Sequence, residues 1–217
     1  MFARENLHRP FIVAPTLSWK EAWGDRQFCG VFCVTLAYLI GMVVFLNRFL
    51  PYINQREGIV LRDPVLAHLP SVDLSVWLFS VIYASSLVVF IHLIGKPGPL
   101  LRGFVALALV YTLRVVTLYF VPLDPPVGCI PLADPFVLHF AYGNVLVTRD
   151  LFFSGHTACM LTLTLSVRSR TLKRILFVAL AAVIVMLLIQ HAHYTIDILG
   201  ALVLTPLCWR ASRRVTT

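Results

Sequence analysis

The chain has 217 residues, of which 59% are hydrophobic and 13% are charged, and its formal net charge is +8. A soluble domain is nearer to half apolar and a quarter charged, and one of this length could not bury the long apolar blocks present here. The cations lie in short clusters between these blocks and form no single basic face, which argues against nucleic-acid binding. The composition therefore predicts an all-α, multi-pass membrane protein.

The first 27 residues carry charges and aromatic side chains but no apolar stretch typical of a secretory signal. We expect residues 1–27 to form a cytoplasmic N-terminal segment. Within it, Ser18 and Glu21 have the spacing of a capping box, and Trp19 and Trp23 would share one face of a short helix. The pattern fits an interfacial amphipathic helix and an ordinary aromatic belt equally well.

Six apolar blocks follow this segment. A helix needs about 20 apolar residues to cross the hydrocarbon core of a bilayer. We expect six transmembrane helices that form one catalytic domain over residues 28–209, followed by a basic cytoplasmic tail at residues 210–217. The predicted spans are Phe28–Leu50, Leu74–Ile94, Gly103–Val121, Leu151–Val167, Ile175–Gln190 and Tyr194–Trp209.

The distribution of Lys and Arg predicts the orientation, because cytoplasmic loops are enriched in these residues. With the N-terminus inside, 13 of the 18 cations fall in cytoplasmic segments, four fall in outside loops, and Arg114 lies within the third span. Both termini are therefore predicted to be cytoplasmic. The polar motifs at the start of the fourth and sixth spans then lie at the outer face, whether periplasmic, extracellular or luminal.

One of these motifs is His193-Tyr194-Thr195-Ile196-Asp197. Because His193 and Asp197 are four residues apart, they share one face of a helix. A carboxylate bonded to one ring nitrogen fixes the tautomer and stabilises the imidazolium that forms when the other nitrogen reacts. An ionisable residue inside a membrane usually has a functional role, although a structural His–Asp pair between helices is the alternative.

The other motif is Ser154-Gly155-His156-Thr157. Gly155 allows a ligand to approach the backbone closely, and a helix that starts here would point its free N–H groups at an anion such as phosphate. Ser154 and Thr157 could add hydroxyl donors, and His156 could act as a general acid or base. Taken alone, this motif would be read as a simple helix cap.

Together, the two motifs resemble the type-2 phosphatidic acid phosphatase (PAP2) superfamily. The match is nearer to its sphingomyelin synthase branch, which has an aspartate-led segment ending in Ser-Gly-His-Thr and a later His-Tyr-Thr-x-Asp segment. Here these are Asp150–Thr157 and His193–Asp197, and Arg114–Thr117 followed by Val121-Pro122 is a looser match to an upstream motif. The cysteine-glycine that precedes the aspartate in that branch is replaced by Thr148-Arg149.

The resemblance implies a six-helix bundle and a role for each matching residue. His193 would be the nucleophile that becomes a phosphohistidine, Asp197 would orient it, and His156 would protonate the leaving lipid oxygen and later deprotonate the acceptor. No metal site or cofactor is expected. The partners would be membrane lipids, namely a phospholipid donor and a ceramide or similar acceptor. The residues expected to bind phosphate or substrate are Ser154, Gly155, Thr157, Arg114, Arg149, Asp150 and Tyr194.

The sparse cations favour a phosphodiester over a phosphomonoester substrate. Monoesters carry nearly two negative charges, yet only Arg114 and Arg149 are placed to meet phosphate from the outer side. A choline or ethanolamine group would add a cation that an aromatic cage could bind, and Phe152, Phe153 and Tyr142 are candidates unless they serve as packing aromatics. We therefore expect a head-group phosphotransferase or a phospholipase C-like hydrolase. A lipid phosphate phosphatase is the first alternative and a non-catalytic lipid carrier the second.

Overall fold

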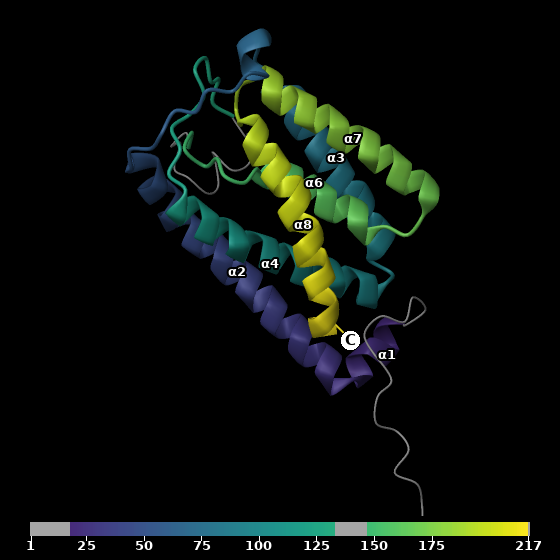
Figure 1. Ribbon diagram of the computed structural model, residues 1–217. Coiled ribbons are helices and arrows are strands. Elements are labelled where there is room, and N and C mark those ends of the chain that lie inside the picture. Colours follow the sequence, from purple (N-terminus) through teal and green to yellow (C-terminus); the bar gives the residue numbers. More distant parts are fainter. Residues whose placement is uncertain (1–17, 133–146, 217) are drawn as a thin grey trace, which may run out of the picture.

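The computed structural model describes residues 18–132 and 147–216. Within these ranges the protein is helical, and its β pairing is limited to a single bridge between Ile59 and Leu123. The predicted all-α class is thus confirmed for the described residues (Figure 1). The helices are α1 (Trp19–Gly24), α2 (Arg26–Gln55), the 3-10 turn η2 (Leu66–His68), α3 (Ser75–Leu93), α4 (Pro97–Phe120), α6 (Gly155–Ser166), α7 (Arg170–Ile189) and α8 (Thr195–Thr216).

Four of these helices, α2, α3, α4 and α7, are long and apolar enough to cross a membrane. They support the prediction of an integral membrane protein. Helix α6 has 12 residues, a length of about 18 Å at ~1.5 Å per residue, whereas the hydrocarbon core is ~30 Å thick. Helix α8 has 22 residues but carries Asp197 in its first turn and two arginines in its last. The number of six spans therefore stays a prediction.

Helix ends differ from the predicted span boundaries at five places: α2 ends at Gln55, α4 starts at Pro97, α7 starts at Arg170, and the start of α6 and the end of α8 also differ. The fourth span was expected to start at Leu151, but α6 starts at Gly155 because the side chain of Ser154 caps it, accepting a hydrogen bond from the Thr157 N–H. Residues 147–154 are not helical. The sixth span was expected to end at Trp209, but α8 continues through Thr216, so the arginines expected in a tail lie on its last turns.

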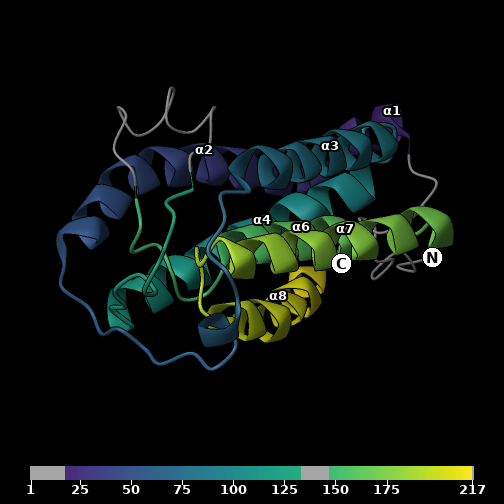
Figure 2. The same ribbon diagram turned by 90° about the horizontal axis from the view of Figure 1, so that it is seen from above.

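Helix α6 is the centre of the bundle and packs against α3, α4, α7 and α8. Helix α4 lies between α2 and α8 in Figures 1 and 2, and it packs against both. Helix α2 packs against α4 and α1 but makes little or no contact with α3. In the most apolar stretch of α2, 6% of the residues are buried, as expected for a helix that faces lipid.

The short helix α1 begins with the capping box predicted from Ser18 and Glu21. Trp19 and Trp23 stack with their ring centroids 6.1 Å apart, and the Trp19 indole N–H donates to the Ile94 carbonyl at 2.5 Å. These contacts fix α1 beside the end of α3. Helix α1 and the C-terminal end of α8 lie at one end of the bundle, and the loops that carry the two histidine motifs lie toward the other (Figure 1).

Candidate active site

His193 lies between α7 and α8, with its side chain 3% exposed. Its Nδ1 atom is 3.3 Å from Oδ2 of the fully buried Asp197, and the same oxygen accepts the Tyr194 backbone N–H at 2.9 Å. Because Nδ1 faces the carboxylate, Nε2 points away from it, and His193 lines a cavity. The carboxylate favours the tautomer with its proton on Nδ1, which leaves the Nε2 lone pair available to attack an electrophile.

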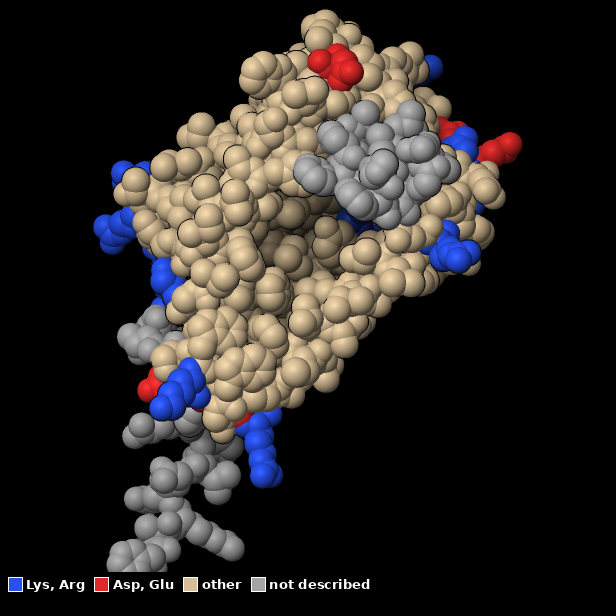
Figure 3. All heavy atoms as spheres, turned by 180° about the vertical axis from the view of Figure 1, so that it is seen from behind, with Lys and Arg blue, Asp and Glu red and all other residues tan. Residues whose placement is uncertain are grey.

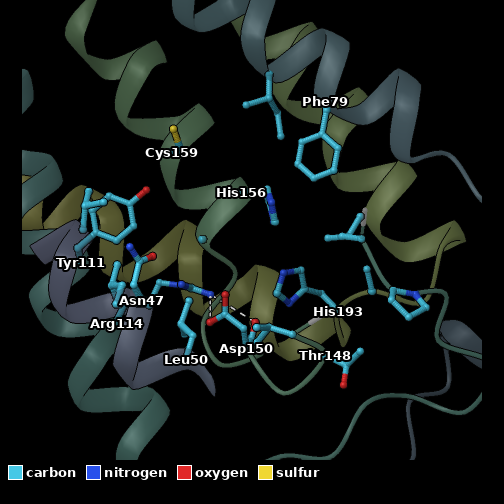
Figure 4. A pocket seen from close by; sticks show the side chains of 18 of the residues that line it. Asn47, Leu50, Phe79, Tyr111, Arg114, Thr148, Asp150, His156, Cys159 and His193 are labelled. Atoms are coloured by element: carbon cyan, nitrogen blue, oxygen red, sulfur yellow. Dashed lines mark hydrogen bonds and ion pairs between the residues drawn. The ribbon is translucent and has the colours of Figure 1, made fainter. Parts of the chain in front are cut away.

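His156 lies in the first turn of α6 and faces the same cavity (Figure 4). The centroids of the His156 and His193 rings are 6.1 Å apart. An attacking atom sits about 3–3.5 Å from its target, and a general acid sits about 2.6–3.2 Å from the atom that it protonates. Two rings at this separation can therefore contact opposite sides of one phosphoryl group.

A backbone hydrogen bond joins the two motifs directly. The Ser154 N–H donates to the Asp197 carbonyl oxygen at 3.1 Å. The Asp197 side chain thus bonds His193, and its backbone carbonyl bonds Ser154, which caps α6 just before His156. The two motifs, which the sequence predicted to share one site, lie side by side in the structure.

Arg114 reaches this site from α4 and is almost fully buried. Its Nε donates to the Phe153 carbonyl at 2.8 Å, and its Nη2 bonds Oδ1 of Asp150 at 2.6 Å. The guanidinium lies directly over Gly155, where a β-carbon would come within 2.8 Å of Arg114 Cζ. The glycine of the motif is therefore needed for the approach of Arg114, in addition to the approach of a ligand expected from the sequence.

The cavity has a volume of about 430 Å³ and two chemically different parts. Its polar part contains His156, His193, Arg114, Asp150 and Thr148 (Figure 4). Its apolar part lies between α2 and α3, and the same cavity is lined there by Leu39, Met42, Val43, Leu46, Phe79 and Ile82. From behind, the molecule shows a hollow walled almost entirely by uncharged residues, with cationic atoms visible at its floor (Figure 3).

Four residues expected to bind phosphate or substrate lie outside the cavity wall: Ser154, Thr157, Arg149 and Tyr194. Ser154 and Thr157 are fully buried, and the Thr157 hydroxyl donates to Ser154 Oγ at 3.1 Å, so both hydroxyls serve the cap of α6. Arg149 pairs with Asp124 and donates to the Asn54 carbonyl at 2.7 Å. Arg149 therefore anchors the 147–154 segment to the end of α2 and leaves Arg114 as the cation beside the histidines.

The aromatic residues expected around a head group also take other positions. Phe153 is fully buried among α4, α6 and α8, and Phe152 packs against Gly200 of α8. Tyr194 is buried, and its hydroxyl accepts from the Leu61 N–H and donates to the Asp124 carbonyl. Tyr142 lies outside the described residues. The aromatic side chains that line the cavity are Phe79, Tyr83 and Tyr111.

Sequence reasoning missed Asp63, a residue of the long loop between α2 and α3. Its carboxylate accepts the Thr195 N–H at 2.6 Å and the Thr195 hydroxyl at 3.1 Å, and so it caps α8 beside His193. Burial raises the pKa of this carboxyl, but the bonds from Thr195, Val65 and Leu66 together outweigh burial and hold the pKa below its usual range. No local pattern marks Asp63, because the helix that it caps begins 132 residues later.

Residues 149–214 match the family model described as PAP2 superfamily C-terminal. No curated protein matches the chain. The matched segment contains both histidine motifs and all of α6 and α7, whereas Arg114 lies before it. The match supports the resemblance to the PAP2 superfamily, and it indicates an activity of the lipid phosphatase or phosphotransferase type.

Proposed function

We propose that the protein is a lipid head-group phosphotransferase of the sphingomyelin synthase type. It would move the phosphoryl head group of a phosphodiester phospholipid to ceramide or another lipid alcohol, or to water, through a phosphohistidine. The observation that carries this proposal is the two-part cavity, in which an apolar channel between α2 and α3 leads to two facing histidines. An amphiphilic phosphate ester fits both parts, because its chains can remain among apolar side chains while its phosphate reaches the polar part.

The charge of the polar part supports a phosphodiester. Among the described residues that line the cavity, Arg114 is the one Lys or Arg, and Asp150 already pairs with it. A phosphomonoester brings about −1.5 to −2 charges near neutral pH, whereas a phosphodiester brings one. The placement of Arg149 outside the cavity strengthens the argument made from the sequence, because the number of cations available to the phosphate falls from two to one.

The proposed reaction has two steps. In the first, His193 Nε2 attacks phosphorus, the bond from phosphorus to the diacylglycerol oxygen breaks, and His156 gives a proton to that oxygen. In the second, His156 takes the proton of the acceptor hydroxyl, the acceptor oxygen attacks the phosphohistidine, and His193 is released. Asp197 stabilises the charge on the His193 ring in both steps. Arg114 would neutralise negative charge on the equatorial phosphate oxygens.

A lipid-product assay tests this proposal. Purified protein is given phosphatidylcholine, phosphatidylethanolamine or phosphatidic acid, each with or without ceramide, and the products are separated. We expect diacylglycerol together with a head group transferred to ceramide or released to water. Inorganic phosphate from phosphatidic acid, without cleavage of either diester, would instead establish a phosphatase. His193→Ala and His156→Ala should each abolish turnover, and His68→Ala is the matched control because His68 lies on the α2–α3 loop away from the cavity.

We further propose that both termini are cytoplasmic and that the site opens near the outer face. Two features support this topology: the excess of cations in the predicted inner segments, and the position of α1 and the end of α8 at the end of the bundle opposite the site loops.

A further inference from the structure

His191 occupies an unusual place at the end of α7. Its φ of +52° lies in the left-handed region, which glycine adopts most easily. The His191 N–H donates to the Leu188 carbonyl and the Ala192 N–H to the Leu187 carbonyl, which is the bonding pattern of a Schellman helix end. Glycine is the usual residue at this position. A histidine here therefore suggests that the side chain contributes something that glycine cannot.

The imidazole of His191 bridges two loops. Its Nδ1 is 2.9 Å from the Val127 carbonyl oxygen, and its Nε2 is 3.2 Å from the Leu69 carbonyl oxygen. Carbonyl oxygens accept hydrogen bonds from ring N–H groups, so one side chain contacts both loops.

The carboxylates on the elements around His191 are engaged with other groups. Asp63 bonds Thr195, and Asp73 bonds the Ser75 N–H. On the remaining elements, Asp124 pairs with Arg149, and Asp197 holds His193. Within the described residues, His191 forms no ion pair, and its ring nitrogens bond the two neutral carbonyls.

The neighbouring Gln190 holds the same loop from the other side. Its fully buried side chain donates to Ser75 Oγ at 2.7 Å and to the Ile130 carbonyl at 3.3 Å. The backbone carbonyl of Gln190 accepts a hydrogen bond from the Ile130 N–H. His191 thus bonds Val127 and Gln190 bonds Ile130, so the chain is held on both sides of Cys129. Cys129, Pro131 and Leu132 form part of the cavity wall together with His193.

We propose that His191 is a positioning residue whose imidazole bridge, from Leu69 to Val127, fixes the 127–132 segment of the cavity wall beside the nucleophile. The role of that wall in turnover rests on the proposed function, but the bridge itself does not. Loss of the imidazole should free the segment even where the helix end remains intact. The variant His191→Gly separates loss of the imidazole from disruption of the helix end, because glycine suits the left-handed backbone and only the side chain is removed.

The test follows modification of Cys129 by a water-soluble maleimide in the full-length protein. Burial raises the pKa of the Cys129 thiol, which keeps labelling slow while the segment is held. We expect His191→Gly to raise the labelling rate about tenfold, the factor that corresponds to ~1.4 kcal/mol, within the range of one hydrogen bond. His191→Asn, whose amide can donate to one of the carbonyls, should give an intermediate rate. The other cysteines are replaced beforehand: Cys29, Cys33, Cys159 and Cys208.

The matched control is His68→Ala, because the His68 ring bonds the Pro64 carbonyl within its own turn. This control should label at the wild-type rate, and the far-UV circular dichroism of His191→Gly should match that of the wild type, as expected if the helix end is intact. Equal labelling of His191→Gly and wild type overturns the proposal. Faster labelling in a protein that cleaves no phospholipid supports the bridge and counts against the proposed function. If the protein does cleave phospholipid, His191→Gly should raise KM more than it lowers kcat.

Discussion

Gly155 gives the sharpest test of the geometry of the site, because Gly155→Ala places one methyl group where the Arg114 guanidinium now lies. The added β-carbon would come within 2.8 Å of Cζ and 2.9 Å of Nε of Arg114. Arginine is usually flexible enough to move aside. Here, however, the Phe153 carbonyl and the Asp150 carboxylate hold the guanidinium at 2.8 Å and 2.6 Å. Relief of the clash therefore requires the loss or lengthening of at least one of these bonds.

A hydrogen bond to a charged group contributes about 1.5–3 kcal/mol, which corresponds to a decrease of about 10- to 150-fold in kcat/KM if that contribution is lost in the transition state. The assay is steady-state cleavage of a labelled phosphodiester lipid. Stability should fall less than activity, because alanine is a better helix former than glycine by ~1 kcal/mol and Gly155 is the first residue of α6. Gly30→Ala is the matched control, since a β-carbon there meets no atom within 4 Å.

A double-mutant cycle gives the result that would refute the reasoning. In an Arg114→Ala background the clash partner is absent, so Gly155→Ala should have almost no further effect. An undiminished effect in that background would mean that Gly155 acts through ligand approach alone. Wild-type activity of the single variant would mean that the position of Arg114 over Gly155 is unimportant.

Three further predictions concern other parts of the protein. Asp197→Asn should lower kcat by about 10²- to 10⁴-fold in lipid turnover with folding retained, since the amide no longer stabilises the charged ring of His193; unchanged kcat would exclude the assigned role. Asp63→Asn should lower the melting temperature at neutral pH. Because the folded pKa of Asp63 lies below its usual 3.8, this difference should be complete above about pH 4 and should vanish as the pH falls through the folded value; a difference that persists in acid would argue against the Thr195 bonds. Maleimide added from opposite sides of sealed vesicles should separately reach Cys129 and a cysteine introduced at Leu172, and labelling of both from one side would overturn the proposed topology.

The parts of the fold that depend on hydrophobic pattern could be predicted from the sequence. Each of the six expected spans overlaps one observed helix, because long apolar blocks have few other stable conformations in a bilayer. The meeting of His156 with His193 was also predictable, since the cation distribution of the sequence placed both motifs at the same end of the predicted bundle. The start of α6 was harder to predict from the sequence, because Leu151–Phe153 are apolar like the helix that follows. The helix nevertheless begins after Ser154, which caps it.

The sequence could not separate the two candidate arginines. Arg114 and Arg149 are both cations near the site, and their roles depend on partners far along the chain: Asp150 for Arg114, and Asn54 with Asp124 for Arg149. The same limit applies to Phe152 and Phe153, which lie within the Asp150–Thr157 motif but pack against the helices. Long-range side-chain pairs of this kind leave no periodic signal, so they require a three-dimensional structure.

The bond between the Ser154 N–H and the Asp197 carbonyl has a consequence for how this chain can vary in length. It joins the two ends of a 44-residue segment, in which α6 runs away from the site and α7 returns toward it, so the site residues are held together at the end opposite the α6–α7 turn. Arg168 and Ser169 are exposed at that turn. Residues inserted there lengthen the turn and leave the site unchanged, so an epitope or a fused domain can be placed at this position.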